Sequence, residues 1–145
     1  MRLSRHSDYA IRVLIHLGAA ATPATSIAAI AEAFGISRFH LMKVVQGLVH
    51  GGFVAARRGR GGGLTLARDP GEIALGAVLR HTEATEAMVP CATCRIAPAC
   101  TLPPLLGRAM AAFLAVLDQA NLADLLADPQ ALLGLLQPTK PAREG

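Results

Sequence analysis

The sequence predicts a mainly α-helical protein with a small β wing: a winged helix-turn-helix followed by a long dimerisation helix. Three observations support this fold class. The composition is 52% hydrophobic with no Trp and 3% aromatic residues, so Ala, Leu, Val and Ile must form the core, and Ala and Leu favour helix. Two short amphipathic patterns meet at a glycine, and two β-type runs flank a stretch of Gly and Arg. The 145 residues suit one domain with an appended arm.

Four segments are expected along the chain. A winged helix-turn-helix DNA-binding domain occupies residues 1–80, and a cysteine loop that binds a cluster occupies residues 81–101. A dimerisation helix with further C-terminal helices follows over residues 102–137, and residues 138–145 form a flexible tail.

Charge differs sharply between the two halves. Residues 1–68 carry nine Lys or Arg against two acids, a net +7, whereas residues 69–145 carry five against eight, a net −3. A basic half joined to an acidic half indicates a nucleic-acid reader with a separate sensing or assembly part. An unevenly charged solvated surface is the alternative.

The first helix is expected over residues 7–18, where apolar residues recur at helical spacing. Ser7 or Asp8 would cap its start, and Gly18 would end it. The expected inward face consists of Ala10, Val13, Leu14 and Leu17.

A helix-turn-helix pattern follows. Residues 26–34 predict a short helix, Gly35 supplies a tight turn, and Ser37 caps a third helix that runs to about residue 50. The inward residues are Ile27, Ile30, Ala31 and Phe34 in the first of these helices and Leu41, Val44, Val45 and Leu48 in the second.

The N-terminal residues of the second helix of such a motif meet base edges in the major groove. Arg38 and Lys43 would donate to guanine edges or phosphates, and Phe39 would contact a thymine methyl group or the backbone. The DNA-contacting set expected on this helix is Ser37, Arg38, Phe39, His40 and Lys43.

A basic hairpin comes next. FVAAR and LTLA are short β-type runs separated by RGRGGG, whose glycines permit a tight tip. A basic hairpin directly after a recognition helix is typical of a wing that grips phosphate or enters the minor groove. A surface loop without a partner is the alternative. The wing residues expected to contact DNA are Arg57, Arg58, Arg60, Gly61 and Gly62.

The second half is also helical. A turn at residues 69–71 leads into a helix that includes Ile73, Leu75, Val78 and Leu79, and residues 121–137 give two short amphipathic pieces. Between them lies a long helix whose apolar stripe, Leu106, Met110, Phe113 and Leu117, is suited to pairing with a second copy. The alternative is that this stripe packs on the first domain.

All three cysteines, Cys91, Cys94 and Cys100, lie within CATCRIAPAC. Clustered thiolates suit zinc or an iron–sulfur cluster. His81 would complete a zinc site of three cysteines and one histidine, a CxxC thiol switch is a second alternative, and inert cysteines are a third. Three cysteines on a cluster would leave one iron for a ligand from elsewhere in the chain or from a partner subunit, which suits sensing.

Together these pieces resemble a known family, the winged-helix iron–sulfur regulators that include IscR, RirA and NsrR. The matching pieces, which span roughly residues 1–137, are MRLSRHSDYAIRVLIHL, SRFHLMKVVQGL, ARRGRGGGLTL, GEIALGAVLR, the cysteine loop and the helix through AAFLAVLD. Within the family, CRIAPACTL followed by AFLAVLDQANLADLL is most similar to the nitric-oxide-responsive repressors of the NsrR type.

The resemblance implies a homodimer that binds double-stranded operator DNA and senses nitric oxide through an iron–sulfur cluster. It also implies that Asp8 of the partner subunit is the fourth ligand, although the residues alone favour a helix cap or a first-turn acid. The step from Cys91 to Cys94 is shorter than is usual in the family, which leaves 2Fe–2S open beside the favoured 4Fe–4S. No His follows Cys100 in TLPPLLGRA, which argues against an IscR-type site.

Two other functions stay open: a RirA-like sensor of iron or cluster supply, and a zinc-stabilised winged-helix protein. An enzyme is not expected, because paired carboxylates and a nucleophile elbow are missing and RGRGGG lacks the Lys and Ser/Thr of a phosphate loop. The start lacks a signal peptide, and no uncharged apolar run reaches the roughly 18 residues of a membrane helix. We therefore expect a cytoplasmic protein.

Overall fold

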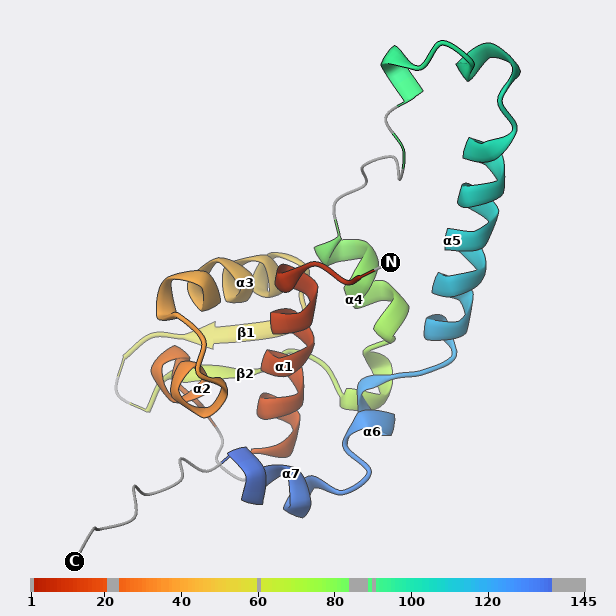
Figure 1. The fold of residues 1–145 in the computed structure, drawn as a ribbon. Coiled ribbons are helices and arrows are strands. Elements are labelled where there is room, and N and C mark those ends of the chain that lie inside the picture. Colours follow the sequence, from red (N-terminus) through yellow and green to blue (C-terminus); the bar gives the residue numbers. More distant parts are fainter. Residues whose placement is uncertain (1, 21–23, 60, 84–88, 90, 137–145) are drawn as a thin grey trace, which may run out of the picture.

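The computed structural model describes residues 2–20, 24–59, 61–83, 89 and 91–136. The elements in chain order are α1 Arg5–Ala19, α2 Ile27–Phe34, α3 Arg38–His50, β1 Val54–Arg57, β2 Gly63–Leu66, η1 Pro70–Glu72, α4 Leu75–Thr82, η2 Cys91–Thr93, η3 Ala97–Ala99, α5 Leu102–Asp118, α6 Leu122–Leu125 and α7 Pro129–Leu136. Figure 1 shows α1 at the centre, with α2, α3 and the two strands on one side and α4 and α5 on the other. The fold class predicted from the sequence is confirmed.

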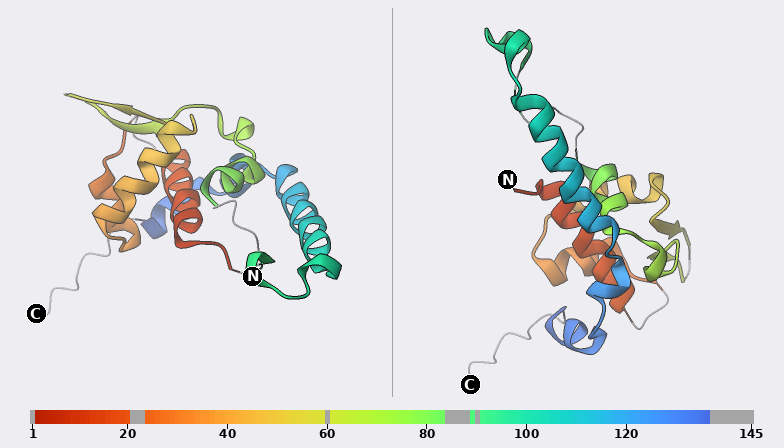
Figure 2. Two further views of the ribbon diagram at one scale, coloured as in Figure 1. Left: turned by 90° about the horizontal axis from the view of Figure 1, so that it is seen from above. Right: turned by 90° about the vertical axis from the view of Figure 1, so that its right-hand side faces the viewer.

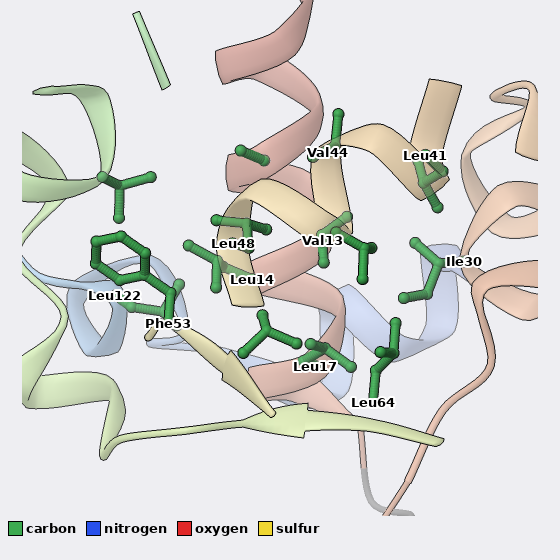
Figure 3. Close-up of a cluster of buried hydrophobic side chains, with 14 of the residues drawn as sticks. Val13, Leu14, Leu17, Ile30, Leu41, Val44, Leu48, Phe53, Leu64 and Leu122 are labelled. Carbon is green, nitrogen blue, oxygen red and sulfur yellow. The ribbon is translucent and has the colours of Figure 1, made fainter. Parts of the chain in front are cut away.

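The core lies between α1, α3 and the strands (Figure 3). The stripes expected on α1 and α3 are both buried, because each repeats at i, i+3, i+4 and i+7 and so forms one helix face. Leu122 of α6 is also fully buried there, and its amide donates to the carbonyl of Ile73 at 2.9 Å. The core of the N-terminal part of the chain therefore includes a residue from beyond the long helix.

Three local expectations were wrong. Helix α1 begins at Arg5, because the hydroxyl of Ser4 accepts the amide of Ser7 at 3.1 Å and so caps the helix. Neither Ser7 nor Asp8 caps it, and Gly18 does not end it, since the helix continues to Ala19. Ile73 lies before α4 rather than within it, although it is fully buried.

The turn between α2 and α3 depends on Gly35, whose φ of 62° is left-handed and favours a residue without a Cβ. The amide of Gly35 donates back to the last turn of α2. Helix α3 then starts at Arg38, with Ser37 in the cap position. Ser37 is exposed, and its side chain makes no capping hydrogen bond.

The strands pair antiparallel, from Val54 opposite Leu66 to Arg57 opposite Gly63. The hairpin is anchored to the helix-turn-helix by a β-bridge in which Thr25 and Leu64 exchange two backbone hydrogen bonds of 3.0 and 2.8 Å. This anchoring sets the direction in which the hairpin projects beside α3 (Figure 2).

Helix α5 runs along one side of the domain and carries the cysteine loop beyond it (Figures 1 and 2). Pro103 and Pro104 fit its first turn, where amides have no partner within the helix. No residue of α5 is fully buried, and Leu105 and Val116 are 56% and 68% exposed. Among the helices of the described residues, none is long and apolar enough to cross a membrane.

Burial of His16 is expected to make the stability of the fold depend on pH. Burial lowers the pKa of His16, whose Nδ1 finds no hydrogen-bond partner within the described residues and whose ring packs edge-on against Phe34 at 6.0 Å between centroids. The folded state therefore favours the neutral ring, so stability is complete above the ordinary value of about 6.5 and falls as pH drops below it.

We expect the melting temperature of the wild type to fall by a few degrees between pH 7 and pH 5.5. His16→Leu should flatten this dependence in thermal denaturation followed by circular dichroism. The matched control is His40→Leu, because His40 is exposed on α3 and should leave the pH dependence intact. An unchanged slope in His16→Leu would assign the dependence to another group.

Candidate DNA interface and cysteine loop

The exposed face of α3 lies opposite its buried stripe, because the two sets of residues are out of phase on the helix. Phe39 is 63% exposed, and the ammonium group of Lys43 lies 4.8 Å from the centroid of its ring. The His40 ring is 6.2 Å from the Phe39 ring. The structure therefore brings together all the candidate residues of this helix, Ser37, Arg38, Phe39, His40 and Lys43, on exposed surface in its cap and first two turns.

The tip of the hairpin presents Arg57 and Arg58 as exposed side chains, whereas Arg60 lies outside the described residues. Gly59 and Gly61 have φ of 94° and 76°, and the amide of Gly62 donates to the carbonyl of Gly59 at 2.9 Å. A Cβ on Gly62 would collide with the carbonyl oxygen of Arg57. The glycines therefore shape the tip, while the arginines supply its charge.

Arg68 has a structural role that the sequence did not indicate. Its guanidinium donates to the carbonyls of Gly52 and Gly51 at 2.9 and 3.2 Å and lies 5.1 Å from the centroid of the Phe53 ring. It thereby satisfies carbonyls that follow the end of α3. A positive charge in the basic half is thus not by itself a sign of DNA contact.

The cysteine loop consists of consecutive tight turns. The amide of Cys94 donates to the carbonyl of Cys91 at 3.1 Å, that of Ala97 to Cys94 at 3.2 Å, and that of Cys100 to Ala97 at 3.3 Å. The short spacing between Cys91 and Cys94 is therefore one turn of 3₁₀ type. Cys94 is exposed, Cys91 and Cys100 are half-buried, and all three thiols are free.

Within the described residues, no group of three or more His, Cys, Asp and Glu side chains is placed to hold a metal ion. His81, the residue considered for a zinc site, instead approaches the carbonyl of Gly47 with Nε2 at 2.7 Å. Asp8 lies on α1 and forms an ion pair with Arg12 at 3.0 Å, its carboxylate half-exposed. Within the described part of the chain, Asp8 and the three cysteines therefore do not form a common metal-binding group.

The end of α4, directly before the cysteine loop, is joined to the start of α1. The hydroxyls of Ser7 and Thr82 are 2.7 Å apart, and the amide of Ser4 donates to the carboxylate of Glu83 at 2.9 Å. Burial raises the pKa of Glu83, but hydrogen bonds from Ser7 and Ser4 outweigh it, so the pKa lies below its ordinary value. These contacts of Ser4 and Ser7 with Glu83 and Thr82, here called the polar clamp, join the end of α4 to the start of α1, the helix that bears Asp8.

A second connection joins α4 to α5, the helix that follows the cysteine loop. Arg80 donates to both carboxylate oxygens of Asp118 at 2.6 Å, and these hydrogen bonds hold the pKa of Asp118 below its usual range. Sequence periodicity did not indicate this pair, because the partners lie 38 residues apart.

The expected dimerisation stripe faces its own domain in part. Phe113 and Leu117 line a groove of about 330 Å³ with Leu3, Ile11, Leu75 and Leu79, between α1, α4 and α5. Leu106 and Met110 are half-exposed. The most exposed apolar side chains of α5 lie outside this stripe, at Leu102, Leu105 and Val116.

Residues 3–128 match the Rrf2 family, described as iron-dependent transcriptional regulators. The chain belongs to the Rrf2 family. It is 44% identical over 143 residues to the HTH-type transcriptional regulator NsrR of Geobacillus kaustophilus (strain HTA426), covering 94% of this chain and 97% of that protein. It is 42% identical over 144 residues to NsrR of Bacillus subtilis (strain 168), covering 94% and 98%. It is therefore an NsrR-type Rrf2 regulator.

Solved Rrf2-like structures share the fold. CymR, the global cysteine regulator of B. subtilis, matches with a TM-score of 0.69 and 27% identity, covering 88% of this chain and 97% of that one. IscR of T. potens matches with a TM-score of 0.68 and 26% identity, covering 91% and 90%. This Rrf2 protein is thus a winged-helix DNA-binding transcriptional regulator and not an enzyme.

Proposed function

We propose that this Rrf2 protein is a homodimeric repressor that holds an iron–sulfur cluster and releases operator DNA when nitric oxide attacks that cluster. The observation that carries the proposal is that Cys91, Cys94 and Cys100 all belong to one loop outside the core, in a chain 44% identical to an NsrR protein. Three thiolates within ten residues are a donor set that iron–sulfur clusters use. A 4Fe–4S cluster is favoured, with 2Fe–2S as the alternative.

Asp8 of a second copy is the proposed fourth ligand. Its carboxylate is half-exposed and is engaged by Arg12 alone among the described salt bridges. Ligation would draw the carboxylate away from Arg12, so the two partners compete for one group.

The homodimer is proposed to pair through α5, whose described residues are nowhere fully buried. Exposed apolar residues on a helix outside the main core mark an interaction surface. Leu106 and Met110 lie next to this uncovered surface, and Phe113 and Leu117 would sit at its inner edge. Two copies would present two α3 helices to a symmetric operator.

When bound, the cluster supplies iron atoms that react with nitric oxide. The chain contributes the connection to DNA: the Glu83 and Thr82 contacts hold the start of α1, and α1 packs on α3 through the core. Releasing Asp8 would remove the restraint that the partner subunit places on α1 and, through the packing of α1 on α3, shift the position of α3. A coupling of about 2–3 kcal/mol would change operator affinity roughly 30- to 150-fold.

Purification without oxygen should yield a coloured protein with a visible absorption band, iron and acid-labile sulfide. Cys94→Ala should abolish the colour and lower operator affinity about 30-fold or more, if the coupling has the magnitude given above. Nitric oxide added to the wild type should release DNA in an electrophoretic mobility shift. The matched control is Thr93→Ala, which alters the same loop without removing a thiol and should keep both colour and response.

A colourless protein with stoichiometric zinc would overturn the cluster and leave a zinc-stabilised regulator. The description of the family as iron-dependent favours a second candidate, a RirA-like sensor of iron or cluster supply. DNA release on iron chelation, with no response to nitric oxide at equal cluster occupancy, would select that candidate.

A further inference from the structure

Two large apolar side chains stand out on the exposed face of α3. Phe39 is 63% exposed and Met42 is 57% exposed. They are three residues apart and therefore neighbours on the helix surface. The core does not require them, because the buried face of the same helix is already formed by its own apolar stripe. Their exposure calls for a partner that offers apolar groups.

The partner must also tolerate positive charge. Arg38 and Lys43 lie on the same turns, and α3 contains no acidic residue. Arg57 and Arg58 add charge at the hairpin beside it. Apolar side chains framed by cations fit the major groove of DNA, where the C5-methyl group of thymine is the apolar feature of the base edges.

Lys43 adds a constraint on the Phe39 ring. Its ammonium group lies over one face of the ring at 4.8 Å from the centroid. A cation over one face leaves the other face and the edge for a partner. The Lys43 ammonium group also lies close enough to the ring to donate a hydrogen bond to a phosphate or a guanine acceptor beside the base that Phe39 contacts.

We propose that Phe39 and Met42 read thymine through its methyl group, so that each half-site carries thymines beneath the first two turns of α3. This inference rests on the DNA-binding function and specifies which bases the helix selects. Residues three apart on a helix are separated by about 4.5 Å along the axis, and base pairs by about 3.4 Å. The two thymines should therefore lie within about one or two base-pair steps of each other.

The test replaces thymine by deoxyuridine, which removes only the methyl group. An operator duplex is first selected from a random pool by the full-length, cluster-loaded wild type, and each thymine is then replaced in turn. At two neighbouring positions the wild type should lose about fourfold in affinity per methyl, the value expected for burying one such group.

Phe39→Ala should lose affinity for the thymine duplex and show no further loss at one of these deoxyuridine positions, and Met42→Ala should do the same at the other. The matched control is Val49→Ala on the same helix, 39% exposed but in the last turn, which should retain the full loss at both. Each substituted side chain is exposed, so all three variants should have the melting temperature of the wild type.

Equal affinity of the wild type for thymine and deoxyuridine at every position would overturn the proposal, even if Phe39→Ala weakens binding. Losses that are the same in the wild type and both variants would also overturn it, because another residue would then contact the methyl groups. Failure to enrich any duplex would instead overturn DNA binding itself, and the reading of bases with it.

Discussion

Leu14→Ala should lower the free energy of unfolding by about 2–5 kcal/mol, the range for removing a buried leucine side chain from a packed core. Leu14 is fully buried on α1, and Figure 3 draws it beside Leu48 and near Phe53. Helix α1 contacts α3, α4, α6 and β2. Several elements would have to shift together to close a cavity at Leu14, so most of the cavity should remain. The cost should be near the upper end of the range.

Urea denaturation followed by circular dichroism measures this effect. Leu135→Ala is the matched control, because Leu135 is 81% exposed on α7 and its truncation should change the free energy of unfolding by less than about 0.5 kcal/mol. A similar loss in both variants would mean that the α1 packing does not dominate stability.

Removing the two arginines that the described part of the hairpin exposes, as Arg57→Gln with Arg58→Gln, should weaken operator binding about a thousandfold or more at 0.1 M salt. Each phosphate contact contributes about 0.9 to the slope of log affinity against log salt, or roughly tenfold at this concentration. Two contacts per protomer are proposed, and the homodimer would lose both sets. The loss should be similar for specific and random duplexes, because phosphate contacts carry no base information.

Fluorescence anisotropy across a salt series checks both the affinity and the slope. Arg108→Gln on α5 removes an exposed charge far along the chain from the hairpin and should leave the slope unchanged. A double hairpin variant with a wild-type slope but lower specific affinity would mean that these arginines read bases instead of phosphates.

Local patterns in the sequence were sufficient for most elements. The stripes on α1 and α3 are periodic, so their burial could be predicted from spacing alone, and Gly35 marked the turn between α2 and α3 by its conformational freedom. The hairpin followed from two β-type runs around glycines. The start of α1 was missed because Ser4, Ser7 and Asp8 all have capping side chains, and only the backbone geometry selects Ser4.

The residues of the candidate sites also fall into those that the sequence predicted and those that only the structure revealed. The exposed α3 residues were predictable, because they lie close together in the sequence on one helix, whereas binding of a cluster by the three cysteines stays a prediction. The contacts of Arg68, His81 and Arg80 were not predictable, because their partners are distant carbonyls or carboxylates. Nothing in the residue type separates an arginine that contacts DNA from one that closes a helix end.

By itself, then, the sequence determined which residues form most helices and strands and which face of each is apolar, since both depend on neighbours within a few positions. Only the tertiary structure decided that Leu122 completes the N-terminal core and that Phe113 and Leu117 face α1 and α4. The physical reason is that such contacts depend on how whole elements pack, and packing joins residues that no local period relates.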